Sequence, residues 1–275
     1  MLQIERFFRF LPALFLLILI LGSLTASSVA AKTIIYPMQE VKSDPRQHFP
    51  LVLLEAILQQ TGEQYELRPA SFPSQQERSL KLLESGEIDV VWSGSNQQRE
   101  QSHRPIRIPM YKGMFGWRVM LVKDKNEDLL RNVKDKSALR KFTFGLGGDW
   151  PDVQLFEAND MRVVTTRSYE SLFTMLQHDR FDVFPRSVLE VWQELDRFGD
   201  KGIALDPHIV IYYPYHSYYF VSKHNAQLAK DIENGFNLLI QSGVYEHMFQ
   251  EEFGELLQQA KLSKRRKFDF HNPNH

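Results

Sequence analysis

The segment Gly86–Glu100 reads GEIDVVWSGSNQQRE and combines a short apolar run with a polar continuation. Its apolar part, Ile88–Trp92, is short and predicts a buried strand. The polar residues that follow predict a loop at the carboxyl end of this strand. Ligand sites of α/β proteins lie beyond the carboxyl ends of parallel strands, so this loop is the first place to look for a binding site.

The elements predicted before this strand alternate between strands and helices. Apolar, β-branched runs indicate strands, and apolar residues three or four positions apart indicate amphipathic helices. In chain order these are a strand at 32–37, a helix at 49–60, a strand at 65–68 and a helix at 75–83. With the strand at 88–92 they form a β-α-β-α-β unit, which favours a mainly parallel sheet flanked by helices.

The same order returns later in the chain. Strands are predicted at 118–122, 142–146, 163–165 and 181–184, and helices at 151–158 and 168–177. Asp149 and Ser168 are the expected caps of these two helices. Two strand patterns, at 209–213 and 215–221, and two helical patterns, at 228–242 and 245–257, follow. The sequence therefore predicts an α/β protein with two such units.

Composition limits the possible functions. The 275 residues allow one large domain or two of moderate size. Lys and Arg number 33 and Asp and Glu 34, and this net charge of -1 argues against a nucleic-acid partner. The absence of cysteine from the sequence excludes disulfides, thiolate metal ligands and cysteine nucleophiles.

Both ends of the chain differ from the rest. Residues 1–31 combine Arg6 and Arg9 with an apolar run, Phe10–Leu21, and small residues up to Ala31. This pattern predicts a secretory signal peptide cleaved before Lys32 and a periplasmic location in a Gram-negative cell; an uncleaved membrane anchor is the alternative. Residues 264–275 are polar and basic, which predicts a solvated tail.

Four segments follow one another in a recognisable order. They are Gly86–Arg99, the Ile-Pro-Met-Tyr-Lys-Gly segment at 108–113, the Leu-Gln-His-Asp-Arg-Phe-Asp segment at 176–182, and the helical segment 228–245. Together they resemble the motifs of type II periplasmic solute-binding proteins, the kind that delivers polar amino acids to membrane transporters. The resemblance covers nearly all of the chain after residue 31.

This resemblance implies two α/β lobes joined by two crossing strands, near 117–122 and 217–221. The first lobe comprises 32–118 and 219–263, and the second 119–218. Such proteins close about a hinge over a small polar ligand, an organic acid or an amino acid. The implied partner is an inner-membrane permease or a sensor, and the expected state is a monomer with neither cofactor nor metal.

Several site residues follow from the resemblance. Arg99 matches the family arginine that holds a ligand carboxylate, and a guanidinium suits that task because it donates two parallel hydrogen bonds. A surface arginine paired with Glu87 or Glu100 is the alternative. Ser95 and Asn96 stand where the family places hydroxyl or backbone donors, and Tyr111 lies in the segment 108–113.

The second unit adds further candidates. Gly147–Pro151 joins a strand to a helix start, where free backbone N–H groups favour an anion. Trp150 there is expected either to stack on a ligand or to pack within its own lobe. Where the family usually has an aspartate for the ligand's ammonium, this chain has Arg186. Arg99 and Arg186 would make a doubly cationic site for a dicarboxylate; otherwise Glu40 or Asp149 supplies the acid.

An enzyme is the alternative to a binding protein. The sequence has no G-x-S-x-G elbow, no H-E-x-x-H pair and no P-loop. Asp179 and Asp182 are better explained by loop solvation than by acid–base chemistry. The expectation is a binding protein without enzymatic activity. A dehydratase-like member of the same fold, or a soluble receptor that feeds a membrane signalling protein, is the alternative.

Overall fold

The structure is a computed structural model that describes residues 31–38 and 45–273. Glu40 and residues 1–30, which hold nearly all of the predicted signal peptide, lie outside the described residues. No described helix is both long enough and apolar enough to span a bilayer.

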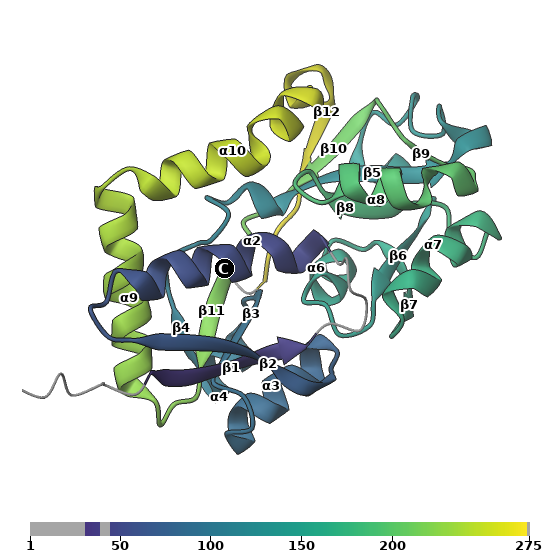
Figure 1. The fold of residues 1–275 in the computed structure, drawn as a ribbon. Coiled ribbons are helices and arrows are strands. Elements are labelled where there is room, and N and C mark those ends of the chain that lie inside the picture. Colours follow the sequence, from purple (N-terminus) through teal and green to yellow (C-terminus); the bar gives the residue numbers. More distant parts are fainter. Residues whose placement is uncertain (1–30, 39–44, 274–275) are drawn as a thin grey trace, which may run out of the picture. The chain divides into compact units, whose positions relative to one another are not determined.

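The described residues of the first lobe form two small sheets and five helices. Figure 1 shows their arrangement. Strand β1 (Lys32–Met38) pairs in parallel with β2 (Tyr65–Pro73). Strand β11 (Ser217–Val221) pairs antiparallel with both β3 (Val90–Gly94) and β4 (Arg104–Ile106). The helices are α2 (Pro45–Gln59), α3 (Gln76–Ser85), α4 (Gln97–Ser102), α9 (Ala226–Gln241) and α10 (Val244–Gln259).

Close packing of α2 on α9 requires a glycine. A Cβ atom at Gly235 of α9 would lie 2.2 Å from the backbone oxygen of Ile57 in α2. The two backbones approach so closely because Gly235 has no side chain. This contact buries Leu53 and Leu54 of α2 in the core of the first lobe.

The second lobe is built on a five-stranded sheet with the order β12-β10-β5-β8 and with β9 beside β5. Its strands are β5 (Trp117–Lys123), β8 (Phe184–Ser187), β9 (Ile203–Leu205), β10 (Ile209–Tyr212) and β12 (Arg266–Asp269). Strands β6 (Thr143–Gly147) and β7 (Arg162–Thr166) form a separate parallel pair. The helices of the second lobe are α5 (Lys136–Leu139), α6 (Asp152–Ala158), α7 (Tyr169–Gln177) and α8 (Val191–Phe198). The described residues of both lobes also form 3₁₀ turns, which are η1 (Met114–Gly116), η2 (Asp124–Asn126), η3 (Gly199–Lys201) and η4 (Leu262–Lys264).

The predicted α/β fold with two lobes is confirmed. Parallel pairing occurs where it was expected, at β1–β2 and β6–β7. The sheets are nevertheless mixed, because β5 and β11, which occupy the two predicted crossings, pair antiparallel with their neighbours. The lobe boundaries at 118/119 and 218/219 stay a prediction.

The prediction of a solvated tail at 264–275 is wrong. Strand β12 pairs in parallel with β10, so the chain returns to the second lobe after α10. Phe268 and Phe270 alternate with polar residues and are 6% and 4% exposed, respectively. One of the basic side chains also makes hydrogen bonds to the protein: the guanidinium of Arg265 donates to the backbone oxygen of Ala260 at 2.9 Å and to that of Asp206. The alternation of buried and exposed residues at 268–270 therefore determines the structure of this segment, despite the basic residues at 264–267.

Candidate functional site

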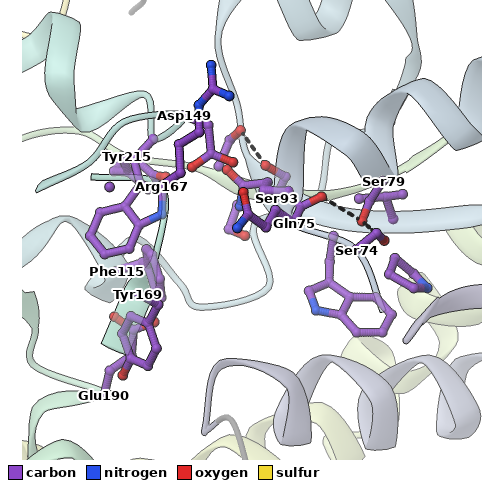
Figure 2. A pocket seen from close by; sticks show the side chains of 18 of the residues that line it. Ser74, Gln75, Ser79, Ser93, Phe115, Asp149, Arg167, Tyr169, Glu190 and Tyr215 are labelled. Carbon is purple, nitrogen blue, oxygen red and sulfur yellow. Dashed lines mark hydrogen bonds between the residues drawn. The ribbon is translucent and has the colours of Figure 1, made fainter. Parts of the chain in front are cut away.

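A cavity of about 300 Å³ lies between the loops of the two lobes, and we call it the interlobe pocket (Figure 2). Its size is at the lower end of the roughly 300–1,000 Å³ usual for small-molecule sites. From the first lobe it is lined by Ser74, Gln75, Ser79, Trp92 and Ser93, and from the second by Asp149, Trp150, Arg167, Tyr169, Glu170 and Glu190. Three aromatic residues from the segments around the crossings also line the pocket: Tyr111, Phe115 and Tyr215.

Aromatic rings form a wall of this pocket. Tyr111 stacks on Phe115 with ring centroids 4.8 Å apart, and Phe115 lies 5.4 Å from Tyr215. Tyr215 fits only because residue 94 is glycine, since a Cβ atom there would lie 1.7 Å from its hydroxyl oxygen. The structure thus places Tyr111 in the lining. Its contact with a ligand stays a prediction.

Small polar groups face the aromatic wall in Figure 2. The hydroxyl groups of Ser74 and Ser79 lie 2.7 Å apart, and Ser79 also donates to the backbone oxygen of Gln75 at 3.1 Å. Aromatic walls with a few fixed polar groups are typical of sites for small polar molecules.

Arg99 is 5% exposed, and its guanidinium is directed at protein atoms. It donates to the Ser93 hydroxyl at 2.6 Å and to the backbone oxygens of Gly94 and Asp149, each at 2.9 Å. Burial lowers the pKa of Arg99 from its usual value, although nearby oxygens oppose the effect. Arg99 does not line the interlobe pocket; it lines a neighbouring hollow with Asn96 and Trp150. That Arg99 holds a ligand carboxylate stays a prediction.

Ser95 and Asn96 have local partners. Asn96 caps α4, because its Oδ1 atom accepts from the Arg99 backbone N–H at 2.8 Å. Ser95 donates from its hydroxyl to Glu100 at 2.5 Å, and its backbone N–H donates to His216. These bonds hold the loop after β3 in place. Ligand contacts of both residues stay predictions.

Trp150 lines both the interlobe pocket and the neighbouring hollow. Its ring is stacked against Phe184 at 6.4 Å and lies 4.9 Å from the Arg186 guanidinium carbon. It therefore packs within its own lobe and is also available to a ligand. Both expectations for this residue are compatible with the structure.

Arg186 does not form a doubly cationic site with Arg99. It is 2% exposed and is absent from the described lining of the pocket. Its guanidinium pairs with Glu194 at 2.6 Å and with Glu190 at 2.9 Å. Burial alone would lower the pKa of Arg186, but the two carboxylates raise it well above its usual value. The positive charge at residue 186 is thus neutralised inside the lobe.

The carboxylate of Glu190 also connects Arg186 to a second buried arginine. Its Oε2 atom lies 3.9 Å from Arg118, which pairs with Asp152 at 2.7 Å and donates to the Tyr213 hydroxyl at 2.6 Å. Two guanidinium groups and three carboxylates therefore lie behind the pocket. The cluster positions two residues of the lining, Glu190 directly and Tyr169 through a hydrogen bond to Glu194 at 2.7 Å.

Arg167 is the sole cation in the described lining of the interlobe pocket, where Asp149, Glu170 and Glu190 are the acids. Arg167 was not among the site residues predicted from the sequence, although it follows the predicted strand at 163–165 and precedes the cap Ser168. The rule that ligand sites follow parallel strands points to this position. Glu190 and Tyr215 carried no such signal, because only tertiary contacts bring them to the pocket.

Within the described residues, no group of His, Asp or Glu side chains is arranged to hold a metal ion. The buried carboxylates next to the pocket are already paired with guanidinium groups. The chemistry that the lining offers is hydrogen bonding, aromatic contact and charge pairing.

No protein-family model matches the sequence, and no curated protein matches it. Solved structures do match. An ancestral arginine-binding protein bound to arginine aligns over 82% of this chain and 99% of its own, with 17% identity and a TM-score of 0.63. An arginine-specific periplasmic binding protein from Salmonella typhimurium aligns over 81% and 100%, with 17% identity and a TM-score of 0.59. A histidine kinase sensor domain with similarity to periplasmic binding proteins aligns over 82% and 97%, with 14% identity and a TM-score of 0.59.

These similarities confirm that the chain has the fold of type II periplasmic solute-binding proteins. At such identities they establish the fold alone.

Proposed function

We propose that this protein binds a small polar solute, an amino acid or organic acid, in the interlobe pocket. The observation that carries the proposal is the lining itself, in which serines and a glutamine from one lobe face aromatic and charged side chains from the other. A ligand there would touch both lobes and favour their closed arrangement. Two structural neighbours are arginine-binding proteins, which makes L-arginine the first probe.

A thermal-shift screen tests this proposal. The probes are L-arginine, L-glutamine, the other amino acids, di- and tricarboxylates and sugar acids. A ligand at about 100 times its dissociation constant stabilises the fold by roughly 2.7 kcal/mol, which is about 5–10 °C in Tm for a protein of this size. A hit should lose its effect in Tyr215→Ala, in which the aromatic wall is incomplete. If no probe raises Tm or gives a heat signal in calorimetry, the proposal fails.

We further propose that the protein acts in the periplasm as a monomer without turning its ligand over, and that it passes the closed form to a transport permease. The fold and the signal-like residues 1–31 support this assignment. A receptor that reports to a membrane sensor is the second candidate, supported by the sensor-domain neighbour. Pull-down of a permease or of a kinase by the ligand-loaded protein distinguishes the two. Recovery of an unchanged ligand after incubation tests the absence of catalysis.

A further inference from the structure

Arg99 belongs to a helix of the first lobe, but one of its bonds reaches the second lobe. Its Nη1 atom is fixed within the first lobe by Ser93 and Gly94, and its Nη2 atom donates to the backbone oxygen of Asp149 at 2.9 Å. The side chain is almost fully buried. A buried guanidinium needs such acceptors, because an unpaired buried charge is strongly unfavourable.

A second bond joins the lobes at the same residue. The Oδ2 atom of Asp149 accepts from the backbone N–H of Glu77, in the first turn of α3, at 3.3 Å. N–H groups in the first turn have no partner within the helix, and a carboxylate is favourable at this end. Asp149 therefore contacts two separate elements of the first lobe, α3 through its side chain and α4 through its backbone.

We propose that Arg99 and Asp149 form a latch that holds the two lobes together in the absence of ligand. Arg99 then acts as a positioning residue for closure and not as the group that receives a ligand carboxylate. This inference rests on the proposed function in one respect, since the pocket that the latch closes is the proposed ligand site. The latch leaves Arg167 as the cation that the described lining presents to an anionic ligand group.

The latch can be tested without any ligand. Because the sequence has no cysteine, Ser85→Cys and Glu157→Cys introduce the only two thiols for spin labels. Both positions are exposed, and they lie on α3 and α6, which line opposite sides of the hollow next to the latch. Double electron–electron resonance measures the distance between the two spin labels and so reports whether the lobes are together or apart.

The labelled wild-type protein, freed of ligand by dialysis, should show a dominant short distance. Arg99→Lys retains the charge but cannot span Gly94 and Asp149, and Asp149→Ala removes the bond to Glu77. Each variant should add a population at longer distance. Arg104→Ala is the matched control, because Arg104 is an exposed arginine on β4 outside the described linings of the pocket and the hollow, and it should leave the distribution unchanged. Circular dichroism checks that each variant is folded.

A wild-type protein without the short-distance population would overturn the latch. Wild-type distributions in both Arg99→Lys and Asp149→Ala would also overturn it, as would an equal change in Arg104→Ala. Should one latch variant not fold, the other and the wild-type measurement still decide the question. None of these outcomes depends on the ligand screen, so failure of the latch and failure of the proposed binding function are separate results.

Discussion

Arg186 is buried in the second lobe, where two carboxylates pair with its guanidinium. The sequence placed a cation directly after a predicted strand, but its buried partners, Glu190 and Glu194, lie in a later segment that carried no motif. Arg99 was singled out by the resemblance to the solute-binding family, and its contact with Asp149 could not be foreseen because the two residues are 50 positions apart. Sequence patterns locate such side chains, but pairing between distant segments decides their roles.

Arg186→Met should destabilise the protein strongly. The substitution leaves the carboxylates of Glu190 and Glu194 buried without their main partner, and breaking a buried ion pair in this way costs about 3–5 kcal/mol. Arg131→Met is the control, because Arg131 pairs with Asp128 on the surface with both side chains about 60% exposed. Exposed pairs contribute about 0–1 kcal/mol. Urea unfolding measures both variants, and equal losses would contradict the buried cluster.

Asp206 provides a pH-dependent prediction. It is fully buried, and burial raises its pKa above the usual value, although backbone N–H groups of His208 and Ile209 donate to it and partly oppose the shift. A raised pKa in the folded state means that the folded protein binds the proton of Asp206 more tightly than the unfolded protein does. Stability from this group is therefore present below the unfolded pKa, about 3.9, and is lost as pH rises through the folded pKa.

Asp206→Asn cannot lose a proton and keeps an acceptor for the two backbone groups. The Tm of this variant minus that of the wild type should therefore increase as pH rises from about 3 to about 7. Asp128→Asn should show the opposite trend, because hydrogen bonds from Arg131 and His208 lower the pKa of Asp128. A pH-independent difference for Asp206→Asn would count against its buried charge.

Among the elements, most strands and helices of the two β-α-β-α-β units were predictable from periodicity, although the strand predicted at 181–184 is found later, as β8 at Phe184–Ser187. The strand predicted at 118–122 is found as β5 at Trp117–Lys123, and the helix predicted at 168–177 as α7 at Tyr169–Gln177. Strand β12 was missed because four consecutive basic residues, at 264–267, obscured the short alternation Phe268-Asp269-Phe270. A strand of this length is recognisable only when its partner is known.

Phe268→Ala tests this element. If β12 belongs to the second-lobe core, removing a buried phenylalanine should cost about 3–5 kcal/mol. Lys264→Ala, in the same basic run but exposed, should stay within about 0.5 kcal/mol of the wild type. Chemical denaturation gives both values. If Phe268→Ala lowered the free energy of unfolding by less than about 1 kcal/mol, the prediction of a solvated tail would be supported instead.

At the scale of the whole molecule, the cores of the two lobes are not independent. Val188 and Leu189 directly follow β8 of the second lobe but pack in the core of the first, and Phe115 contacts the cores of both lobes. A chain that crosses between the lobes at several points adds to this coupling. Unfolding of one lobe would expose apolar surface of the other.

We therefore expect the protein to unfold in a single thermal transition. Scanning calorimetry should give a ratio of calorimetric to van't Hoff enthalpy close to one, as in two-state unfolding. Leu189→Ala, which weakens the shared core, should broaden the transition or divide it. Two resolved transitions in the wild type would show that the lobes fold separately.

The late position of β12 along the chain has a consequence for biosynthesis. Until residue 269 has left the ribosome, one edge of β10 has no partner in its own sheet. That edge carries the sequence Ile-Val-Ile-Tyr, and unprotected apolar edges of this kind recruit strands from other chains. A nascent chain is therefore exposed to aggregation through this edge from the synthesis of residue 212 until residue 269 has emerged. Chaperones that cover the segment 209–212, or a delay of folding until the last strand arrives, would protect it.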